Sequence, residues 1–315
     1  MNAERTEFRR KERILIVGGT GFIGRHLARK CLILTPYVTC LSLGMKQHDE
    51  QVMEGAEIIR CDMADKEALS SVICGRPFDY VFNLGGYIDH IPYFQGGRRV
   101  IESHFIGLLN LTDCLDIKQL KGFVQIGSSD EYGNAHSPQN ESIRESPISP
   151  YSLAKTAASH FIQTISNTEG FPGVVLRLFL TYGPGQDDKR FLPQIIKGCL
   201  ENADFKTSEG KQVRDFCYVD DAVDAMIKAS VSPAARGHII NIASGIPVTI
   251  RDMVESVIKI TGGGRPQWGA YPYRKGENMS LYADIGRAIE LLDWKPNISL
   301  EDGLRKTIEY YKAVI

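Results

Sequence analysis

The sequence lacks an excess of charge of either sign, and it lacks any apolar run long enough to cross a bilayer. Its 315 residues include 37 Lys and Arg and 38 Asp and Glu, which gives a formal net charge of -1. This balance does not indicate a nucleic-acid partner, and the missing apolar run does not indicate a membrane partner. The apolar run after the basic start, residues 14–17, is too short for a signal peptide and breaks into glycines.

Paired cysteine and histidine motifs are also missing. The seven cysteines form no C-x-x-C pair and lie singly in apolar contexts, at Cys31, Cys40, Cys61, Cys74, Cys114, Cys199 and Cys217. We therefore expect reduced thiols in the core of a cytoplasmic protein, not a disulfide framework or a zinc site. The seven histidines show no pair with ligand spacing, so no metal site is predicted.

The sequence does contain a repeated alternation of short β-branched runs and helical patterns. Helices are predicted between the strands, for example at 24–34, 98–120 and 152–167. The strands are predicted at 13–17, 37–43, 57–60, 80–83, 122–126 and 174–179. Strands separated by helices pair in parallel through right-handed crossovers. The fold class is therefore α/β, a doubly wound parallel sheet.

The pattern changes after residue 182, where a turn-rich loop precedes a predicted helix at 191–199. Strands are predicted at 213–219 and 238–242 with a helix between them, and helices at 285–292 and 300–312 close the chain. We interpret 13–182 as a dinucleotide-binding domain to which 213–245 returns. Residues 183–212 and 246–315 form a smaller C-terminal substrate lobe, and residues 1–12 form a solvated N-terminal tail.

Three glycines follow the first predicted strand and open the first predicted helix. Gly18 permits a tight turn, Gly21 lets the backbone approach a pyrophosphate at the helix N-terminus, and Gly24 lets helix and strand pack closely. Phe22 and Ile23 belong to the same segment. The loop predicts dinucleotide binding, with a plain strand–turn–helix as the alternative.

Ser42 occupies the end of the second strand, where an acid usually binds the adenosine ribose hydroxyls and selects NAD. Without that acid nothing repels a 2′-phosphate, and Lys46 follows closely, so NADP is predicted. The alternative is an NAD enzyme in which Ser42 is a neutral replacement. Asp62 is placed to accept a hydrogen bond from the adenine amine, or else it caps the next helix. The remaining candidate cofactor contacts are Met63, Leu84 and Gly85.

Tyr151 and Lys155 form a Tyr-x-x-x-Lys motif at the start of a predicted helix, so the two side chains share one face. A phenol ordinarily titrates near pH ~10, and a nearby ammonium group lowers that pKa. The pair is suited to move a proton on or off a sugar hydroxyl during hydride transfer. Ser128, at the end of the fifth strand, points toward the ligand crevice. The alternatives are a surface Tyr–Lys pair and a simple turn at Ser128.

With these motifs the chain resembles the extended short-chain dehydrogenases/reductases that act on nucleoside-diphosphate sugars. The resemblance covers nearly the whole chain and rests on the glycine loop and residues 81–86, 127–133, 149–155, 176–185, 213–221 and 292–296. It implies a Rossmann doubly wound parallel sheet with a C-terminal sugar-nucleotide lobe, and a catalytic triad of Ser128, Tyr151 and Lys155. It also implies that Arg214 and Arg274 grip a substrate diphosphate, which suits guanidinium geometry. A homodimer through helices near 98–120 and 152–167 is a further implication.

Departures from the family motif set the expected reaction. Members that are 4,6-dehydratases place an Asp-Glu pair after the triad hydroxyl, whereas this chain has Ser129 and Asp130 as candidate substrate contacts there. Segment 127–133 looks more like the 4-keto-6-deoxy-sugar reductases of the family. Leu180 and His104 each replace a frequent Asn.

We therefore expect an enzyme that reduces a nucleoside-diphosphate 4-keto hexose with NADPH. A 4-epimerase that holds NAD tightly uses the same residues and is the close alternative. A dehydratase is third, and a dinucleotide-sensing scaffold is the non-enzymatic alternative, which the intact triad disfavours.

Overall fold

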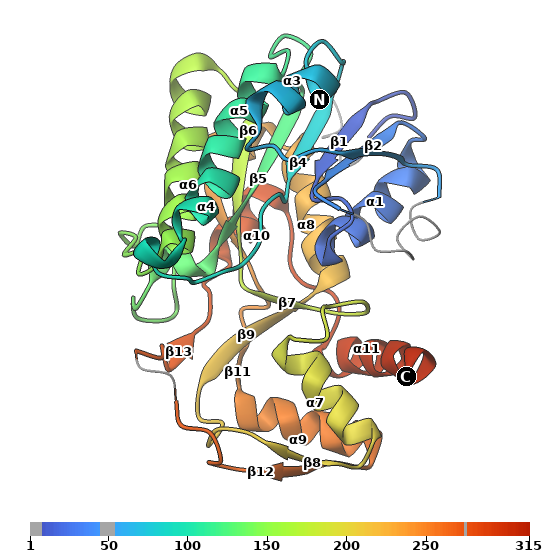
Figure 1. The fold of residues 1–315 in the computed structure, drawn as a ribbon, viewed down its shortest axis with the longest axis vertical. Coiled ribbons are helices and arrows are strands. Elements are labelled where there is room, and N and C mark those ends of the chain that lie inside the picture. Colours follow the sequence, from blue (N-terminus) through green and yellow to red (C-terminus); the bar gives the residue numbers. More distant parts are fainter. Residues whose placement is uncertain (1–7, 45–53, 274–275) are drawn as a thin grey trace.

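The fold is built on a seven-stranded parallel sheet (Figure 1), seen in a computed structural model that describes residues 8–44, 54–273 and 276–315. The sheet order is β10-β6-β5-β4-β1-β2-β3. This order confirms the predicted α/β doubly wound sheet. The strands are β1 (Ile14–Val17), β2 (Val38–Ser42), β3 (Glu57–Arg60), β4 (Tyr80–Asn83), β5 (Gly122–Ser128), β6 (Gly173–Leu178) and β10 (Ile239–Ile242).

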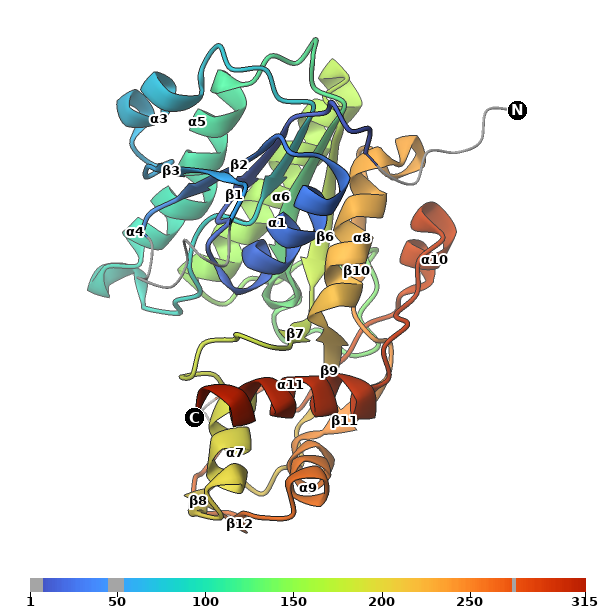
Figure 2. The same ribbon diagram turned by 90° about the vertical axis from the view of Figure 1, so that its right-hand side faces the viewer.

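Helices cover both faces of this sheet, which is why β1 is apolar at every position. Ile14 and Ile16 join a core cluster with Leu27, whereas Leu15 and Val17 join a second cluster on the other face. Figure 2 shows α3 and α5 on one side of the sheet and α8 on the other. The helices are α1 (Phe22–Leu34), α3 (Lys66–Ile73), α4 (Arg98–Ile101), α5 (Gly107–Cys114), α6 (Pro150–Glu169), α8 (Val219–Val231) and α10 (Gly286–Leu292). Within the described ranges, no helix has the length and apolar character needed to cross a membrane.

A smaller lobe lies below the large sheet in Figure 1. It contains a four-stranded sheet of β7 (Leu180–Tyr182), β9 (Val213–Tyr218), β11 (Pro247–Thr249) and β13 (Ser280–Leu281). The pair β8 (Asp204–Lys206) and β12 (Arg265–Gln267) and helices α7 (Phe191–Leu200), α9 (Ile250–Thr261) and α11 (Leu300–Val314) complete it. The expectation that 213–245 returns to the large sheet is wrong for β9, because only α8 and β10 rejoin that sheet.

The expectation of a solvated N-terminal tail is wrong for Phe8 and Glu12, whereas residues 9–11 between them are exposed. Phe8 is buried, with its ring centre 4.8 Å from that of Tyr80. Glu12 is also buried and pairs with Lys121. An aromatic ring and a paired carboxylate therefore fix this segment against the sheet, although the sequence shows only alternating charges there.

The helix predicted at 98–120 is shorter and is interrupted. A π-helical turn, η2 (Glu102–Ile106), separates α4 from α5, and α5 ends at Cys114. Such turns widen a helix locally and often occur at functional sites. Here the turn carries His104, which lies beside Tyr151.

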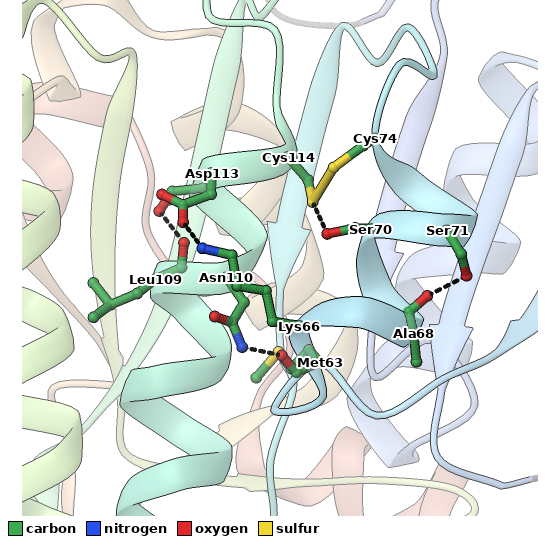
Figure 3. The surroundings of a disulfide bond; sticks show 11 residues. Met63, Lys66, Ala68, Ser70, Ser71, Cys74, Leu109, Asn110, Asp113 and Cys114 are labelled. Atoms are coloured by element: carbon green, nitrogen blue, oxygen red, sulfur yellow. Dashed lines mark hydrogen bonds and ion pairs between the residues drawn. A yellow bond between two sulfur atoms is a disulfide. The ribbon is translucent and has the colours of Figure 1, made fainter.

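The expectation that all cysteines are reduced is wrong for one pair. Cys74, directly after α3, and Cys114, the last residue of α5, form a disulfide with their Cα atoms 4.5 Å apart (Figure 3). The same two helices are joined by an ion pair between Lys66 and Asp113 (2.8 Å). The two cysteines are 40 residues apart in sequence, so only the packing of α3 on α5 reveals the pair. The remaining five cysteines are free.

Candidate active site

Three central strands end at the same edge of the large sheet. Val17 of β1 is in register with Asn83 of β4, and Asn83 with Gln125 of β5. Because the strands are parallel, the loops that follow them share one edge, where ligands of such sheets bind. The glycine loop, the segment after β4 and the segment after Ser128 are thereby gathered at one site.

The glycine loop adopts the conformation that its residues predict. Gly18 has φ +75°, and a Cβ there would lie 2.9 Å from the carbonyl oxygen of Leu84. A Cβ on Gly24 would lie 2.1 Å from the carbonyl oxygen of Gly18, so the helix packs closely on the loop. Gly21 is the N-cap of α1 and provides no side-chain cap, which leaves the N–H groups of Phe22 and Ile23 for an anion. The residues present fit a dinucleotide pyrophosphate.

The adenosine end of this site combines Ser42 with a residue that sequence reasoning missed. Ser42 Oγ lies 2.5 Å from Thr20 Oγ1. Arg60, paired with Ser42 in the register of β2 and β3, donates from Nε to the carbonyl of Leu43 (3.1 Å). The Arg60 guanidinium group therefore lies beside the residue that follows Ser42, at the end of β2. Lys46 lies outside the described residues.

The other cofactor candidates, Asp62, Met63, Leu84 and Gly85, follow β3 and β4, and their contacts with a cofactor stay predictions. Asp62 does not cap the next helix, because Asp65 accepts the hydrogen bond from Ala68 N at the start of α3. Asp62 instead accepts one from Ala64 N (2.9 Å). Its role toward adenine stays a prediction. Gly85 is close to buried Met63, since a Cβ on Gly85 would lie 2.9 Å from Met63 Cε.

Tyr151 and Lys155 lie in the first turns of α6. The helix begins there because Ser149 caps it by accepting a hydrogen bond from Ser152 N and because Pro150 occupies the first turn. Both side chains are only 4% exposed. Lys155 Nζ donates to the carbonyl of Ile126 (2.8 Å) and lies 5.9 Å from the centre of the Tyr151 ring.

The ionisation of the two residues differs from the expectation. Burial raises the pKa of Tyr151, and a hydrogen bond with Ser128 and the charge of Arg190 lower it in part. Burial also lowers the pKa of Lys155 to about 8. The expected lowering of the Tyr151 pKa by Lys155 is therefore wrong in this structure, because desolvation disfavours both charged forms. Tyr151 keeps its proton at neutral pH.

A buried ion pair holds Ser128 in place. Glu131 accepts a hydrogen bond from the backbone N–H of Ser128 (2.7 Å) and another from Ser159 Oγ (2.8 Å). Arg177 Nε donates to the same carboxylate (2.8 Å), and neither charged side chain is exposed. Arg177 stands within the otherwise apolar strand β6, and such a charged residue is a signal for a buried ion pair. Sequence reasoning did not use this signal.

Two histidines that the motif did not identify as site residues surround Tyr151. The ring of His104 lies 5.2 Å from that of Tyr151, and burial together with the charge of Lys155 lowers the pKa of His104 to about 3. The ring of His90 lies 5.5 Å from Tyr151, and its Nε2 is 2.7 Å from Asp130 Oδ2. Ser129 is buried, and its contact with substrate stays a prediction.

Arg214 lies in β9 and pairs with Glu277. Glu277 lines a cavity of about 470 Å³ between residues 134–137 and 276–280, which the triad residues do not line. A diphosphate would compete with Glu277 for Arg214, and this role stays a prediction. Arg274 lies outside the described residues.

The parallel sheet, the glycine loop after β1 and the Ser–Tyr–Lys triad together define a nicotinamide-dinucleotide-dependent enzyme. Residues 14–243 match the model of the NAD dependent epimerase/dehydratase family. The chain belongs to this family, as its motifs indicate.

Known relatives agree with this assignment over nearly the whole chain. The UDP-N-acetyl-alpha-D-glucosaminuronate decarboxylase of Bacillus cytotoxicus is 28% identical, over 96% of this chain and 99% of that protein. The structure of UDP-glucose 4-epimerase with UDP-glucose from Thermotoga maritima matches with a TM-score of 0.87 and 28% identity, over 96% and 99% of the two chains. The structure of UDP-glucuronic acid 4-epimerase from Bacillus cereus, in complex with UDP-glucuronic acid and NAD, matches with a TM-score of 0.84 and 25% identity. The match covers 96% of this chain and 100% of that chain.

Proposed function

We propose that this enzyme reduces the C4 ketone of a nucleoside-diphosphate 4-keto-6-deoxy hexose. NADPH, when bound at the glycine loop, supplies the hydride. Tyr151 donates a proton to the C4 oxygen while Ser128 donates a hydrogen bond to it. Lys155 binds the nicotinamide ribose, and the hydrogen bond from Ser128 stabilises the phenolate that Tyr151 becomes.

The observation that carries this proposal is the state of Tyr151, which is buried, hydrogen-bonded to Ser128 and protonated at neutral pH. A phenol that retains its proton is suited to donate it to a ketone oxygen as hydride arrives. The Asp-Glu pair of dehydratases is replaced by Ser129 and Asp130, which argues against loss of water.

The test mixes the full chain with NADPH or NADH and the UDP or dTDP forms of a 4-keto-6-deoxyhexose. We expect substrate-dependent loss of reduced-nicotinamide absorbance. Tyr151→Phe should lower kcat about 10²–10⁴-fold, the usual size of a general-acid contribution. The matched control is Tyr37→Phe, a half-exposed tyrosine at the opposite end of the sheet, which should react as wild type. No oxidation of either cofactor would refute the reductase.

The proposed cofactor is NADP, supported by Ser42 and by the guanidinium of Arg60 beside it. Loss of a charge-assisted contact with the 2′-phosphate costs about 1.5–3 kcal/mol. We therefore expect Arg60→Ala to raise KM for NADPH about tenfold or more and to leave KM for NADH unchanged. Arg76→Ala is the control, because Arg76 pairs with Glu57 at the other end of β3.

A 4-epimerase is the second candidate, favoured by the similarity to 4-epimerases solved with UDP-sugars and, in one case, NAD. In that reaction the same triad oxidises C4 and returns the hydride to the other face of the ketone. NAD released on denaturation, with sugars interconverting by NMR and no net NADPH oxidation, would establish the epimerase and refute the interpretation of Ser42.

The substrate class, the assembly and the compartment belong to the same proposal. A nucleoside-diphosphate sugar is supported by the UDP-sugars in similar structures and by the position of Arg214 in the lobe. A homodimer through α5 and α6 is supported by exposed Ile106 and Leu153 on adjacent helices. The cytoplasm is supported by the five free cysteines, and the redox state of Cys74 and Cys114 in cells would test it.

A further inference from the structure

The two sulfur atoms of the Cys74–Cys114 disulfide have different surroundings. Cys74 is exposed, whereas Cys114 is buried. The Oγ of Ser70, four residues before Cys74, lies 3.7 Å from the sulfur of Cys114 and donates a hydrogen bond to it (Figure 3). A thiolate from solvent can therefore reach one sulfur, and a hydroxyl donor stands beside the other.

These surroundings favour one direction of thiol–disulfide exchange. A thiolate attacks the sulfur that it can reach, and the other sulfur leaves with the electron pair of the S–S bond. Attack at Cys74 forms a mixed disulfide there and releases Cys114 as a thiolate. The Ser70 hydroxyl stabilises this leaving thiolate, because a hydrogen bond to a charged form favours that form. The pair is thus suited to reversible cleavage by small thiols.

The helices that the disulfide joins also contact the segment between β3 and α3, where the adenine end of the cofactor site is predicted. Asn110 Nδ2 of α5 donates to the carbonyls of Met63 (3.0 Å) and Ala64 (3.2 Å), the first of which is drawn in Figure 3. Gly107 begins α5, and a Cβ there would lie 2.6 Å from Met63 Cγ. The packing of α5 therefore fixes Met63, a candidate cofactor contact.

We propose that Cys74 and Cys114 form an exchange site for small thiols of the glutathione class, and that their disulfide strengthens binding of the dinucleotide cofactor. The disulfide keeps α3 and α5 together, so that α5 holds Met63 in place before the cofactor arrives. Without the cross-link the two helices separate more easily, and the affinity falls with the fraction of chains that have the arrangement needed for binding. Cofactor binding precedes reduction and epimerisation alike, so the site acts in either reaction.

The exchange consumes two small thiols and yields one small disulfide. The first thiolate bonds to Cys74 as Cys114 leaves, and the second attacks the mixed disulfide and releases Cys74. Each released thiolate takes a proton from solvent, so the protein disulfide is reduced and the small thiols are oxidised. The reverse steps, with a small disulfide as oxidant, restore the cross-link. In the cytoplasm, the compartment proposed above, a disulfide is usually catalytic or redox-sensing.

The experiment compares the full chain after equilibration with oxidised or with reduced glutathione. Alkylation of Cys74 and Cys114, followed by mass spectrometry, defines the two states, and far-UV circular dichroism checks that both are folded. Binding of NADPH and of NADH is followed by reduced-nicotinamide fluorescence. We expect reduction to raise the dissociation constant of the preferred cofactor about fivefold or more, the lower end of typical coupling between two sites. Cys74→Ser should show the weaker binding, and dithiothreitol should not change it further.

A second measurement tests the role of Ser70. Loss of one hydrogen bond to the leaving sulfur should slow cleavage by reduced glutathione about two- to tenfold in Ser70→Ala. Ser71→Ala is the matched control, because Ser71 is exposed and its hydroxyl donates to the carbonyl of Ala68 (2.7 Å). Cleavage at the wild-type rate in Ser70→Ala would overturn the role of Ser70.

The outcomes for the switch and for the reductase are distinguishable. Equal cofactor affinity in the two states would overturn the switch, as would a disulfide that reduced glutathione does not cleave. Loss of the circular dichroism signal on reduction would show a structural cross-link and would overturn it too. Absence of cofactor binding in the disulfide state would refute both proposals. Weaker binding in the reduced state, without oxidation of NADPH or NADH by a ketone substrate, would support the switch and refute the reductase.

Discussion

Tyr151 shares its surroundings with two groups that can become cations, Lys155 and His104. Burial lowers the pKa of Lys155 to about 8, and burial together with the charge of Lys155 lowers that of His104 to about 3. The His104 side chain is held in place by Tyr87, whose carbonyl lies 2.8 Å from its Nε2. A neutral imidazole packs against Tyr151 without adding a second buried positive charge, so the charge of Lys155 stays available for a cofactor or an oxyanion.

The lowered pKa of His104 predicts a pH dependence of stability. Between pH 6.5 and about 3 the unfolded chain binds a proton at this residue that the folded chain does not. The contribution of neutral His104 to the free energy of unfolding is therefore fully present above pH 6.5 and is lost as the pH falls toward 3. Between pH 7 and pH 5 we expect the free energy of unfolding to fall by about 2 kcal/mol because of His104. His104→Asn should remove that loss, as measured by urea unfolding at both pH values.

The control for this prediction is His136→Asn, because His136 is exposed and lies outside the Tyr151 contacts. That variant should keep the pH dependence of wild type. An equal loss of stability between pH 7 and pH 5 in wild type and in His104→Asn would show that His104 titrates normally in the folded protein.

At the scale of elements, the contact between α3 and α5 provides a prediction about stability. The Cys74–Cys114 disulfide closes a loop of 40 residues in the unfolded chain. A cross-link of this span stabilises a fold by about 2–4 kcal/mol, mainly by restricting the unfolded state. We expect dithiothreitol or Cys74→Ser to lower the unfolding free energy by that amount in a denaturant titration. Cys61→Ser, at a free cysteine, should change the unfolding free energy little. A mass measurement that counts seven free thiols in wild type, and not five, would contradict the cross-link.

The large sheet could be predicted element by element, whereas in the lobe only helices α7 and α11 and strand β9 were predicted. Strand β1 is buried at every position and therefore reads as a continuous apolar run, and the equally buried β6 is interrupted only by Arg177. β7, β8, β11, β12 and β13 have three residues or fewer, which is too short for a pattern to be recognised. β9 was recognised as a strand, but its partners β11 and β13 are set by tertiary packing, so its sheet was assigned wrongly.

The site residues also fall into those that the sequence predicts and those that it does not. Gly18, Tyr151 and Lys155 form local motifs in which the spacing itself reports the geometry. Arg60 and His90 come from separate segments, and only the shared edge of parallel strands brings them to the motif residues, whereas Arg190 lies at the start of α7 in the lobe. The spacing of residues along the chain does not reveal contacts between segments that are so far apart in sequence.

At the scale of the whole molecule, the lobe is fastened to the helix that opens the dinucleotide site. Arg25 Nη2 of α1 donates to the carbonyl of Gly185 (3.0 Å), and His26 lies 2.9 Å from the carbonyl of Pro184. His26 also pairs with Asp220 (3.3 Å), and the resulting hydrogen bond lowers the pKa of Asp220. Residues 183–188 therefore link α1, the helix that follows the glycine loop, to α7 of the lobe.

The proposed homodimer is the prediction that concerns the whole molecule. Ile106 of η2 is 39% exposed, and the neighbouring helix α6 exposes Leu153. A charged group buried in an apolar interface without a partner costs several kcal/mol. At micromolar concentration we expect wild type to sediment at twice the chain mass of 35.1 kDa, and Ile106→Glu to sediment as a single chain. Ile289→Glu on α10, at a residue that is 51% exposed, should remain a dimer. A single-chain mass for wild type would contradict the dimer, whereas dissociation of both variants would mean that the interface is not specific to α5 and α6.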